Sequence, residues 1–262
     1  MNFNKKNILK LKKIIPSIVT LASLCFGISA LKLSLIGRWQ EAIIFVIIAA
    51  ILDAFDGKIA RSLKAESKFG AHLDSLSDFI NFGLIPPLLV YIWQLGNMEY
   101  LGWLAVLFFT ICSAIRLARF NTEQDNEDIK EKTQSKINHN LFFTGVPSPA
   151  GAMACLAPIM ISFISSEISY QTYQNFMWVE EPIFLALYLI FISILGISNL
   201  PVYSVKKGAV GEKYLNLFKI IVALLLIAVI IYPFITTFSV IFLYYTSILI
   251  SSIHYYKAKN AK

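Results

Sequence analysis

Eight long apolar runs dominate this sequence and leave it few folds other than a bundle of membrane-spanning helices. Hydrophobic residues make up 57% of the chain and charged residues 15%, whereas about a quarter of the residues of a soluble protein are charged. A helix that crosses a bilayer takes roughly 20 residues. Runs of about that length occupy residues 15–36, 41–62, 73–95, 101–120, 146–166, 182–203, 217–235 and 237–256. The sequence therefore predicts an all-α, polytopic membrane protein with about eight transmembrane helices in a single domain over residues 1–262.

The basic residues fall almost entirely on one side of this predicted bundle. With eight spans the two termini share a side, and of the 23 lysines and arginines only Lys32 and Arg38 fall on the other side. Cytoplasmic loops of membrane proteins carry the excess of basic residues. Both termini, including a basic N-terminal segment over residues 1–13, are therefore predicted to face the cytoplasm from the inner membrane. The net charge of +7 then indicates contact with an anionic membrane surface and not with nucleic acid.

Four carboxylates lie in or beside the second and third apolar runs. An acidic residue at the centre of an inserted helix costs roughly 2.5–3.5 kcal/mol, so such residues indicate a functional site. Asp53 and Asp56 are three residues apart on one helix, and Asp74 and Asp78 are four apart on the next, so each pair shares a helix face. Oxygen ligands from two helices suit Mg²⁺ or Mn²⁺, which take water and substrate phosphate oxygens as further ligands. The alternative is a set of buried acids that pair with basic residues for structural reasons.

Two small residues and an arginine follow the first carboxylates. Gly57 and Ala60 lie close to the helix stripe that carries Asp53 and Asp56, and their small side chains leave room for a ligand to approach the backbone. Arg61 offers a planar guanidinium suited to phosphate oxygens. The predicted orientation places this segment in the cytoplasmic part of the second span, where a ligand from the cytosol can reach it.

The spacing of these residues, D-x2-D-G-x2-A-R-x8-G-x3-D-x3-D, resembles the pattern of the CDP-alcohol phosphotransferase family. Every fixed position of that pattern is present, as Asp53, Asp56, Gly57, Ala60, Arg61, Gly70, Asp74 and Asp78. The resemblance implies an integral membrane enzyme that moves a phosphatidyl group from a CDP-linked lipid to an alcohol. It also implies two Mg²⁺ or Mn²⁺ ions as cofactors and a homodimer.

The same resemblance implies a role for individual residues. The metal ligands would be the four carboxylates, Asp53, Asp56, Asp74 and Asp78. Asp78 would also be the catalytic general base that takes the proton of the acceptor hydroxyl, because an alcohol is a poor nucleophile until that proton is removed. The binding site for CDP-diacylglycerol would include Gly57, Ala60, Arg61 and Ser67.

Other segments resemble the branch of the family that uses L-serine as the acceptor. They are P-S-I-V-T-L-A-S-L-C-F-G from Pro16, R-L-A-R-F-N from Arg116, F-F-T-G-V-P-S-P-A-G-A from Phe142 and S-N-L-P-V-Y-S from Ser198. This branch converts CDP-diacylglycerol and L-serine to phosphatidylserine and CMP. The first segment departs from the pattern, because Ser17 and Ser23 stand where many relatives carry Asn, which affects the expected contacts of the first span with the nucleotide.

Arg116 and Arg119 are the candidate residues for serine recognition. They lie three residues apart at the cytoplasmic end of the fourth span and could hold a serine carboxylate or a phosphate. Arginines at such a position are equally expected as anchors at the membrane edge.

Two other functions compete with the serine transferase. A sister enzyme that uses glycerol 3-phosphate or an inositol compound would need more basic residues for the additional phosphate. A cation transporter would also carry carboxylates within the membrane. Transport explains the four acids but not the fixed spacing of Gly57, Ala60 and Arg61.

Overall fold

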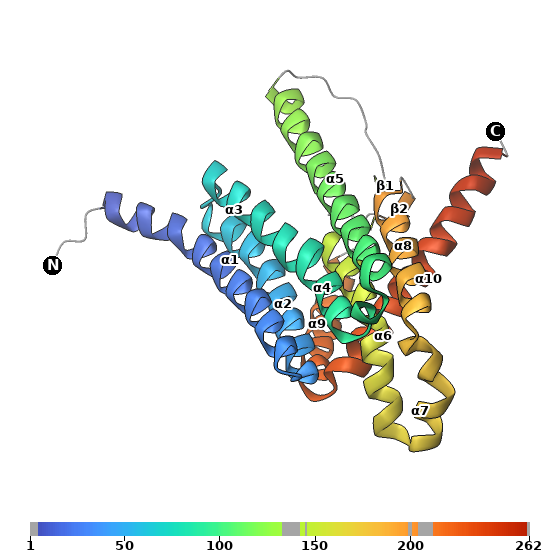
Figure 1. Cartoon of the computed structure of the whole chain (residues 1–262). Coiled ribbons are helices and arrows are strands. Elements are labelled where there is room, and N and C mark those ends of the chain that lie inside the picture. The colour runs from blue at the N-terminus through green and yellow to red at the C-terminus, as the bar shows by residue number, and fades with distance from the viewer. Residues whose placement is uncertain (1–4, 133–141, 145, 199–200, 204–211, 261–262) are drawn as a thin grey trace.

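The computed structural model describes residues 5–132, 142–144, 146–198, 201–203 and 212–260, and nearly all of them are helical (Figure 1). The α-helices are α1 (Lys5–Leu35), α2 (Trp39–Leu63), α3 (Lys68–Asp78), α4 (Ile85–Trp93), α5 (Glu99–Lys132), α6 (Ser148–Ile168), α7 (Tyr170–Phe176), α8 (Pro182–Ile197), α9 (Glu212–Ile231) and α10 (Pro233–Asn260). Shorter helical turns of other types are η1 (Phe79–Leu84), η2 (Leu95–Met98) and η3 (Met177–Glu180).

Several of these helices are long and apolar enough to cross a membrane. In the described part of the chain, four segments meet this condition, Ile14–Leu35, Lys68–Trp93, Leu95–Thr122 and Ser148–Ile168. The consecutive helices from Tyr170 to Ile197, bent by 65°, form a fifth if they make one span. α2 has a suitable length of 25 residues but carries the carboxylates described above, and the apolar parts of α9 and α10 are shorter. The polytopic all-α class is thereby confirmed, and the number of eight spans stays a prediction.

α1 and α2 form an antiparallel pair that supports one side of the molecule (Figure 1). The turn between them contains Gly37, whose φ of 76° lies in the region that glycine adopts without strain. Ala30, Ala42 and Ala49 are completely shielded from solvent. These small side chains allow the two helix backbones to approach closely, as in other membrane helix pairs.

α3 and α4 form one continuous helical segment whose winding changes directly after Asp78. The intervening turn η1 is π-helical. Pro86 and Pro87, at the start of α4, have no N–H groups, so two donors of the regular helical ladder are missing at this point. π-Helical turns are frequent at functional sites. Here the turn lies between a motif carboxylate and the core.

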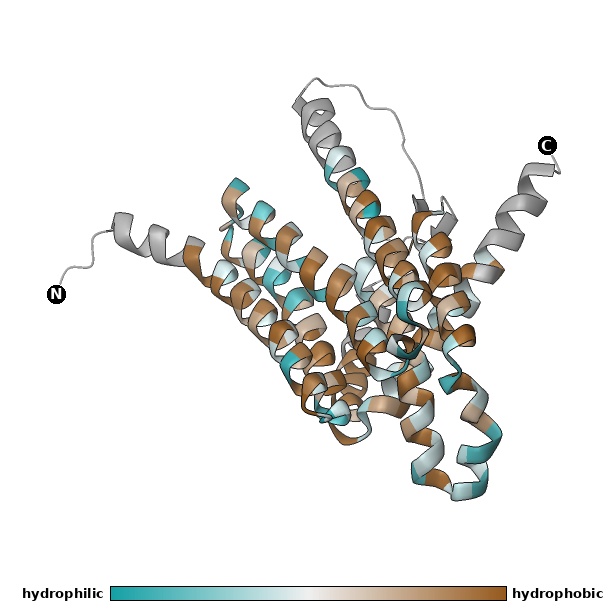
Figure 2. Cartoon of the chain, in the orientation of Figure 1, coloured by the Kyte–Doolittle hydropathy of each residue, from teal (hydrophilic) through white to brown (hydrophobic). Residues whose placement is uncertain are grey.

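The hydrophobic core lies where α4, α5, α6 and α8 meet. Leu89, Leu156 and Leu189 are completely buried there. The outer helix faces are also apolar, as Figure 2 shows, and large side chains such as Leu104 and Leu187 are exposed. Exposed apolar faces of this extent are expected for helices in lipid, since lipid tails are as apolar as leucine.

A short antiparallel ladder differs from the helical prediction. β1 (Phe142–Thr144) precedes α6 and pairs with β2 (Pro201–Tyr203), which follows α8. The prediction of a helix over 182–203 is therefore wrong at its end, because α8 stops at Ile197. Pro201 lacks the N–H that a continuing helix would need. The ladder joins two of the segments on which the resemblance to the serine-using branch rests.

Candidate active site

Three carboxylates from two helices meet at one end of the bundle. Asp53 and Asp56 lie on α2 and Asp74 lies on α3, and an oxygen of each lies within 4.8 Å of those of the other two. Asp56 is 4% exposed, and the other two are half-buried. Carboxylates this close repel one another unless a proton or a cation lies between them. Carboxylates from the two halves of the sequence motif therefore lie together.

Asp78 lies beside this group, one helical turn after Asp74. Its carboxyl lies close to that of Asp53. Its Oδ1 atom is shielded from solvent and has no hydrogen-bond partner among the described residues. Such an oxygen is suited to face a cation or the hydroxyl group of a substrate. Asp78 thus shares the site with the other three acids but is not one of the three that cluster most closely.

The donor set fits a divalent cation. The clustered ligand atoms are all carboxylate oxygens, the ligands that Mg²⁺ and Mn²⁺ prefer. The unpartnered Asp78 oxygen adds a fourth donor at the edge of the group. The structural alternative requires basic partners, but the ion pair found in the described residues, between Arg38 and Glu41, lies elsewhere.

Thr20 of α1 orients one of the carboxylates, and the sequence did not single it out. Its hydroxyl donates to Oδ2 of Asp56 at 2.6 Å. The backbone carbonyl of Thr20 accepts from Ser77 at 3.4 Å, and Asn81 donates to Ser77 and to Ser23. A polar network therefore connects α1 to both motif helices. The sequence shows only a series of hydroxyl-bearing residues in the first apolar run. Their hydrogen-bond partners cannot be read from it.

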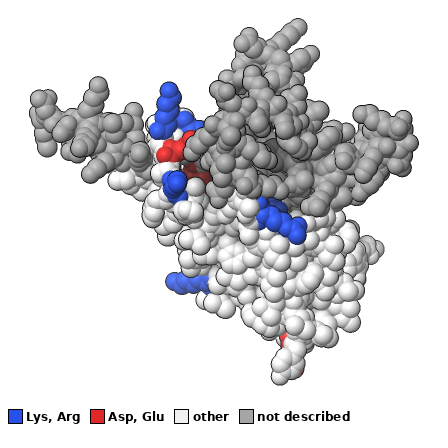
Figure 3. All heavy atoms as spheres, turned by 90° about the horizontal axis from the view of Figure 1, so that it is seen from above, with Lys and Arg blue, Asp and Glu red and all other residues white. Residues whose placement is uncertain are grey.

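Gly57 and Arg61 present an open surface next to the carboxylates. A Cβ atom added at Gly57 would meet only the guanidinium nitrogens of Arg61, at 3.8 and 3.9 Å. The Arg61 side chain therefore lies over the backbone of Gly57 and is itself exposed. Ala60, on the same helix, is half-buried. Seen from this end, acidic side chains lie among basic ones (Figure 3). A negatively charged ligand could contact backbone and guanidinium together.

Ser67 is the N-cap of α3. Its Oγ accepts a hydrogen bond from the backbone N–H of Gly70 at 3.0 Å. A Cβ atom added at Gly70 would lie 3.1 Å from that oxygen and 4.0 Å from Oγ of Ser17. Ser67 and Gly70 of the motif thus lie together near Ser17 of α1, at the start of the helix that carries Asp74.

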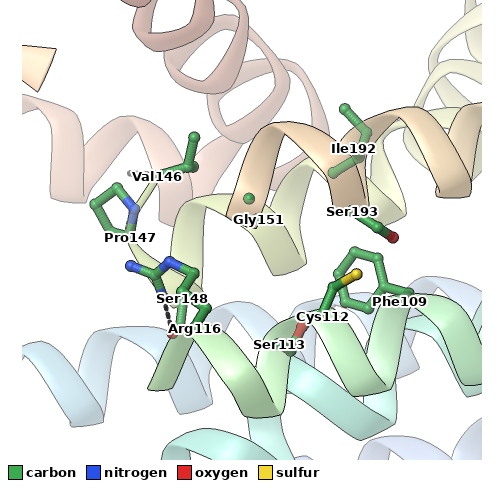
Figure 4. A pocket seen from close by; sticks show the side chains of 11 residues that line it. Phe109, Cys112, Ser113, Arg116, Val146, Pro147, Ser148, Gly151, Ile192 and Ser193 are labelled. Atoms are coloured by element: carbon green, nitrogen blue, oxygen red, sulfur yellow. Dashed lines mark hydrogen bonds between the residues drawn. The ribbon is translucent and has the colours of Figure 1, made fainter. Parts of the chain in front are cut away.

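A small cavity of about 30 Å³ lies between α5, α6 and α8, and Arg116 is the charged residue in its wall (Figure 4). Arg116 of α5 donates to Oγ of Ser148, the first residue of α6. Its Nε is shielded from solvent and has no partner among the described residues. Val146 and Pro147, just before α6, and Ser148 and Gly151 in its first turn line the same cavity. Unpaired N–H groups and the dipole at a helix N-terminus favour an anion.

Arg116 also links this cavity to the carboxylates, because it lies within electrostatic range of Asp78.

Arg119 is placed differently. It is exposed, and its NH1 lies 3.3 Å from the carbonyl of Ile197, the last residue of α8. It does not line the cavity. Of the two arginines that the sequence proposed for serine, the structure places Arg116 in a cavity and Arg119 at a helix end.

Comparisons with known proteins agree with this site. A family model described as CDP-alcohol phosphatidyltransferase matches residues 13–163. The CDP-diacylglycerol–serine O-phosphatidyltransferase of Mycobacterium tuberculosis is 33% identical over 232 residues, which cover 88% of this chain and 76% of that protein. The protein of the same name from Bacillus subtilis is 32% identical over 163 residues, 60% of this chain and 84% of that protein. The one from Helicobacter pylori is 29% identical over 192 residues, 73% of either chain.

Proposed function

The chain belongs to the CDP-alcohol phosphatidyltransferase family, and on this premise we propose that it transfers the phosphatidyl group of CDP-diacylglycerol to the hydroxyl of L-serine, giving phosphatidylserine and CMP. The choice of serine is supported by the names of the relatives across several organisms. The single observation that carries the proposal is the carboxylate cluster, together with the cavity lined by Arg116, which lies within electrostatic range of Asp78 beside that cluster. The first provides for the diphosphate and the second for an acidic acceptor.

The four carboxylates would hold the metal. Members of this family use divalent metal ions, and the acidic triad is able to bind one. We assign Asp53, Asp56 and Asp74 as ligands, with Asp78 as a further ligand through its free oxygen, for two ions of Mg²⁺ or Mn²⁺. Bound there, divalent cations supply Lewis-acid stabilisation of the charge on the diphosphate and on the departing phosphate.

The protein residues would then direct one displacement at phosphorus. The serine hydroxyl oxygen forms a bond to the phosphorus that bears diacylglycerol, and the bond from this phosphorus to the oxygen shared with the CMP phosphate breaks. CMP leaves with that oxygen. The proton of the serine hydroxyl passes to the carboxylate of Asp78, whose Oδ1 has no competing partner among the described residues and which acts as general base.

The CDP-lipid would lie over the second helix. Gly57 and Ala60 leave the helix surface open, and Arg61 provides the fork for phosphate oxygens. Ser67 would contribute through the start of α3, where its hydroxyl already holds the backbone of Gly70. These four residues and the metal ligands lie within the region that the family model matches.

Arg116 would hold the serine carboxylate. A guanidinium with a free Nε, next to a helix N-terminus, is suited to a carboxylate. Replacing Arg116 by Lys should raise the apparent KM for serine strongly, because a planar donor becomes a point charge. The KM for CDP-diacylglycerol should change little. The matched control is Arg119→Lys, which should leave both constants unchanged if Arg119 only caps α8.

The enzyme would work at the cytoplasmic face of the inner membrane as a homodimer. The orientation rests on the placement of basic residues, and the helix ends near both termini lie on the same side of the molecule as the motif (Figure 1). The dimer is proposed from the resemblance to the family, and α9, which packs chiefly against α10, exposes Ile220, Leu224 and Ile230 to lipid or to a partner subunit. Cross-linking in membranes through a cysteine introduced at position 224 would report a partner on this face.

An acceptor panel tests the proposed function. Purified protein is given CDP-diacylglycerol and Mg²⁺ or Mn²⁺ with L-serine, glycerol 3-phosphate or inositol, and CMP is measured. Serine should be the acceptor that drives CMP release. A preference for glycerol 3-phosphate or inositol would assign the chain to a sister activity of the family. No metal-dependent CMP release with any acceptor would favour a cation transporter.

A further inference from the structure

Two adjacent tyrosines on α10 present shielded hydroxyl groups that have no partner in the described part of the chain. They are Tyr244 and Tyr245. Their rings pack edge to face, with centroids 5.8 Å apart. A shielded hydroxyl that donates to nothing is uncommon in a folded protein and calls for an explanation. Two such groups side by side indicate a ligand that supplies the missing acceptor.

The surroundings of the tyrosines identify where that ligand would lie. Both side chains pack against Val146, which lies just before α6, and Ile248 of α10, and Ala150 of α6 joins the same cluster. Val146 also lines the cavity that contains Arg116. Both tyrosines lie within electrostatic range of Arg116. The two hydroxyl groups therefore belong to the neighbourhood of one guanidinium, which itself has a free Nε.

The charge of this neighbourhood identifies the ligand class. Arg116 contributes a positive charge, the N-terminus of α6 contributes a positive dipole end, and the tyrosines contribute O–H donors. Asp78, which also lies within electrostatic range of Arg116, is the proposed acceptor of the substrate proton. A small alcohol with a carboxylate group matches both ends of this arrangement. Its carboxylate would face Arg116 and its hydroxyl would face Asp78.

We propose that Tyr244 and Tyr245 are specificity-determining residues, whose hydroxyl groups donate to the acceptor carboxylate that Arg116 binds. This inference rests on the proposed function and extends it to α10. Helix α10 lies outside the matched region of residues 13–163, so the acceptor would be selected partly by a C-terminal helix that the family model does not include. No covalent step involves the tyrosines.

Steady-state kinetics of phenylalanine variants test this inference. Tyr244→Phe, Tyr245→Phe and the double variant each remove only hydroxyl groups. With CDP-diacylglycerol saturating, each single variant should raise the KM for L-serine about tenfold or more, the effect expected for a hydrogen bond to a charged group. The kcat at saturating serine and the KM for CDP-diacylglycerol should stay near the wild-type values. A retained KM for the lipid also reports an intact fold.

Tyr188→Phe is the matched control. Tyr188 is a half-buried tyrosine of α8 whose hydroxyl already donates to the carbonyl of Ala154 at 2.8 Å. Loss of the Tyr188 hydroxyl should lower thermal stability without changing the KM for serine. A second arm uses L-serinamide, which lacks the carboxylate charge. The single variants and the wild-type protein should use serinamide with equal and low efficiency.

The outcomes separate this inference from the function on which it rests. If wild-type protein releases CMP with serine but the double variant keeps a serine KM within twofold of wild type, the tyrosine assignment is wrong and the function stands. If Tyr188→Phe raises the serine KM as much as the α10 variants do, the effect is structural and the assignment is also wrong. If wild-type protein does not use serine, the proposed function fails and the inference fails with it.

Discussion

Asp53, Asp56 and Asp74 bring their oxygens within 4.8 Å of one another, whereas Asp78 stands beside them with a free oxygen. The sequence predicted which carboxylates form the candidate site, because the spacing of the acids on two helices determines which of them can meet. It did not reveal Thr20, which holds Asp56 from a helix about 36 residues away in the chain, or the α10 tyrosines. Contacts between distant helices depend on packing, which residue spacing within one helix does not encode.

Replacing Asp78 by Asn tests the division of roles among the acids. Turnover should fall by about 10²–10⁴, the usual contribution of a general base. Mn²⁺ binding, followed by electron paramagnetic resonance, should weaken much less, since the three clustered carboxylates remain. Near wild-type turnover at saturating serine would show that Asp78 is not the base. A variant that loses Mn²⁺ binding and turnover together would show that Asp78 is mainly a ligand.

Replacing Gly57 by Ala tests whether this glycine serves the ligand or the fold. A Cβ atom there finds only ordinary contacts at 3.8 and 3.9 Å, and alanine stabilises a helix interior by about 0.5–1 kcal/mol relative to glycine. The thermal midpoint of the protein should therefore stay the same or rise. The KM for CDP-diacylglycerol should increase, because the methyl group fills the space proposed for the nucleotide. Unchanged lipid kinetics would remove Gly57 from the binding site.

At the scale of helices, the apolar runs predicted where most elements lie but not their irregularities. The π-helical turn after Asp78 and the β1–β2 ladder were both missed. Each arises where proline removes backbone donors, and the sequence marks the proline without saying how the chain compensates. The close contact of α1 with η1 was also hidden. It requires Gly27, because a Cβ atom there would lie 2.0 Å from Oδ1 of Asn81.

Replacing Gly27 by Ala should disturb this helix contact and the polar network that orients the site. Overpacking of a close contact typically costs about 1–3 kcal/mol, so the thermal midpoint should fall. The double variant Gly27→Ala/Asn81→Ala should recover part of that loss, since it removes the side chain that the new methyl group meets. Gly151→Ala is the control, because a Cβ atom at Gly151 meets nothing within 4 Å. Equal thermal midpoints for Gly27→Ala and Gly151→Ala would contradict the contact.

The proposed orientation depends on how the helix ends are arranged in the whole molecule. The motif, the free end of α5 and the outer ends of α1 and α10 lie on one side, and α7 lies on the other (Figure 1). Hydropathy predicted the class of the protein, because long apolar runs have no other stable place than a bilayer. It could not determine the number of spans, since acids of the active site make α2 less apolar and α9 and α10 have only short apolar parts.

Cysteine labelling in intact membranes tests the orientation. A cysteine at position 135, which lies outside the described residues, should react with a membrane-impermeant reagent only from the cytoplasmic side. A cysteine in place of Ser166, an exposed residue near the end of α6, should react only from the opposite side. The cysteine-free protein, lacking Cys25, Cys112 and Cys155, provides the background. Labelling of both positions from one side would contradict the eight-span arrangement.

In the proposed function, the carboxylate cluster supports transfer of a phosphatidyl group to serine. Its most direct measurement is the stoichiometry of the products. Purified protein is depleted of metal with a chelator and given CDP-diacylglycerol and labelled L-serine, and Mg²⁺ or Mn²⁺ is then added back. No product should form before metal is added, and afterwards one phosphatidylserine should form for each CMP released. CMP formed without labelled lipid, or labelled lipid formed without metal, would contradict the proposed function.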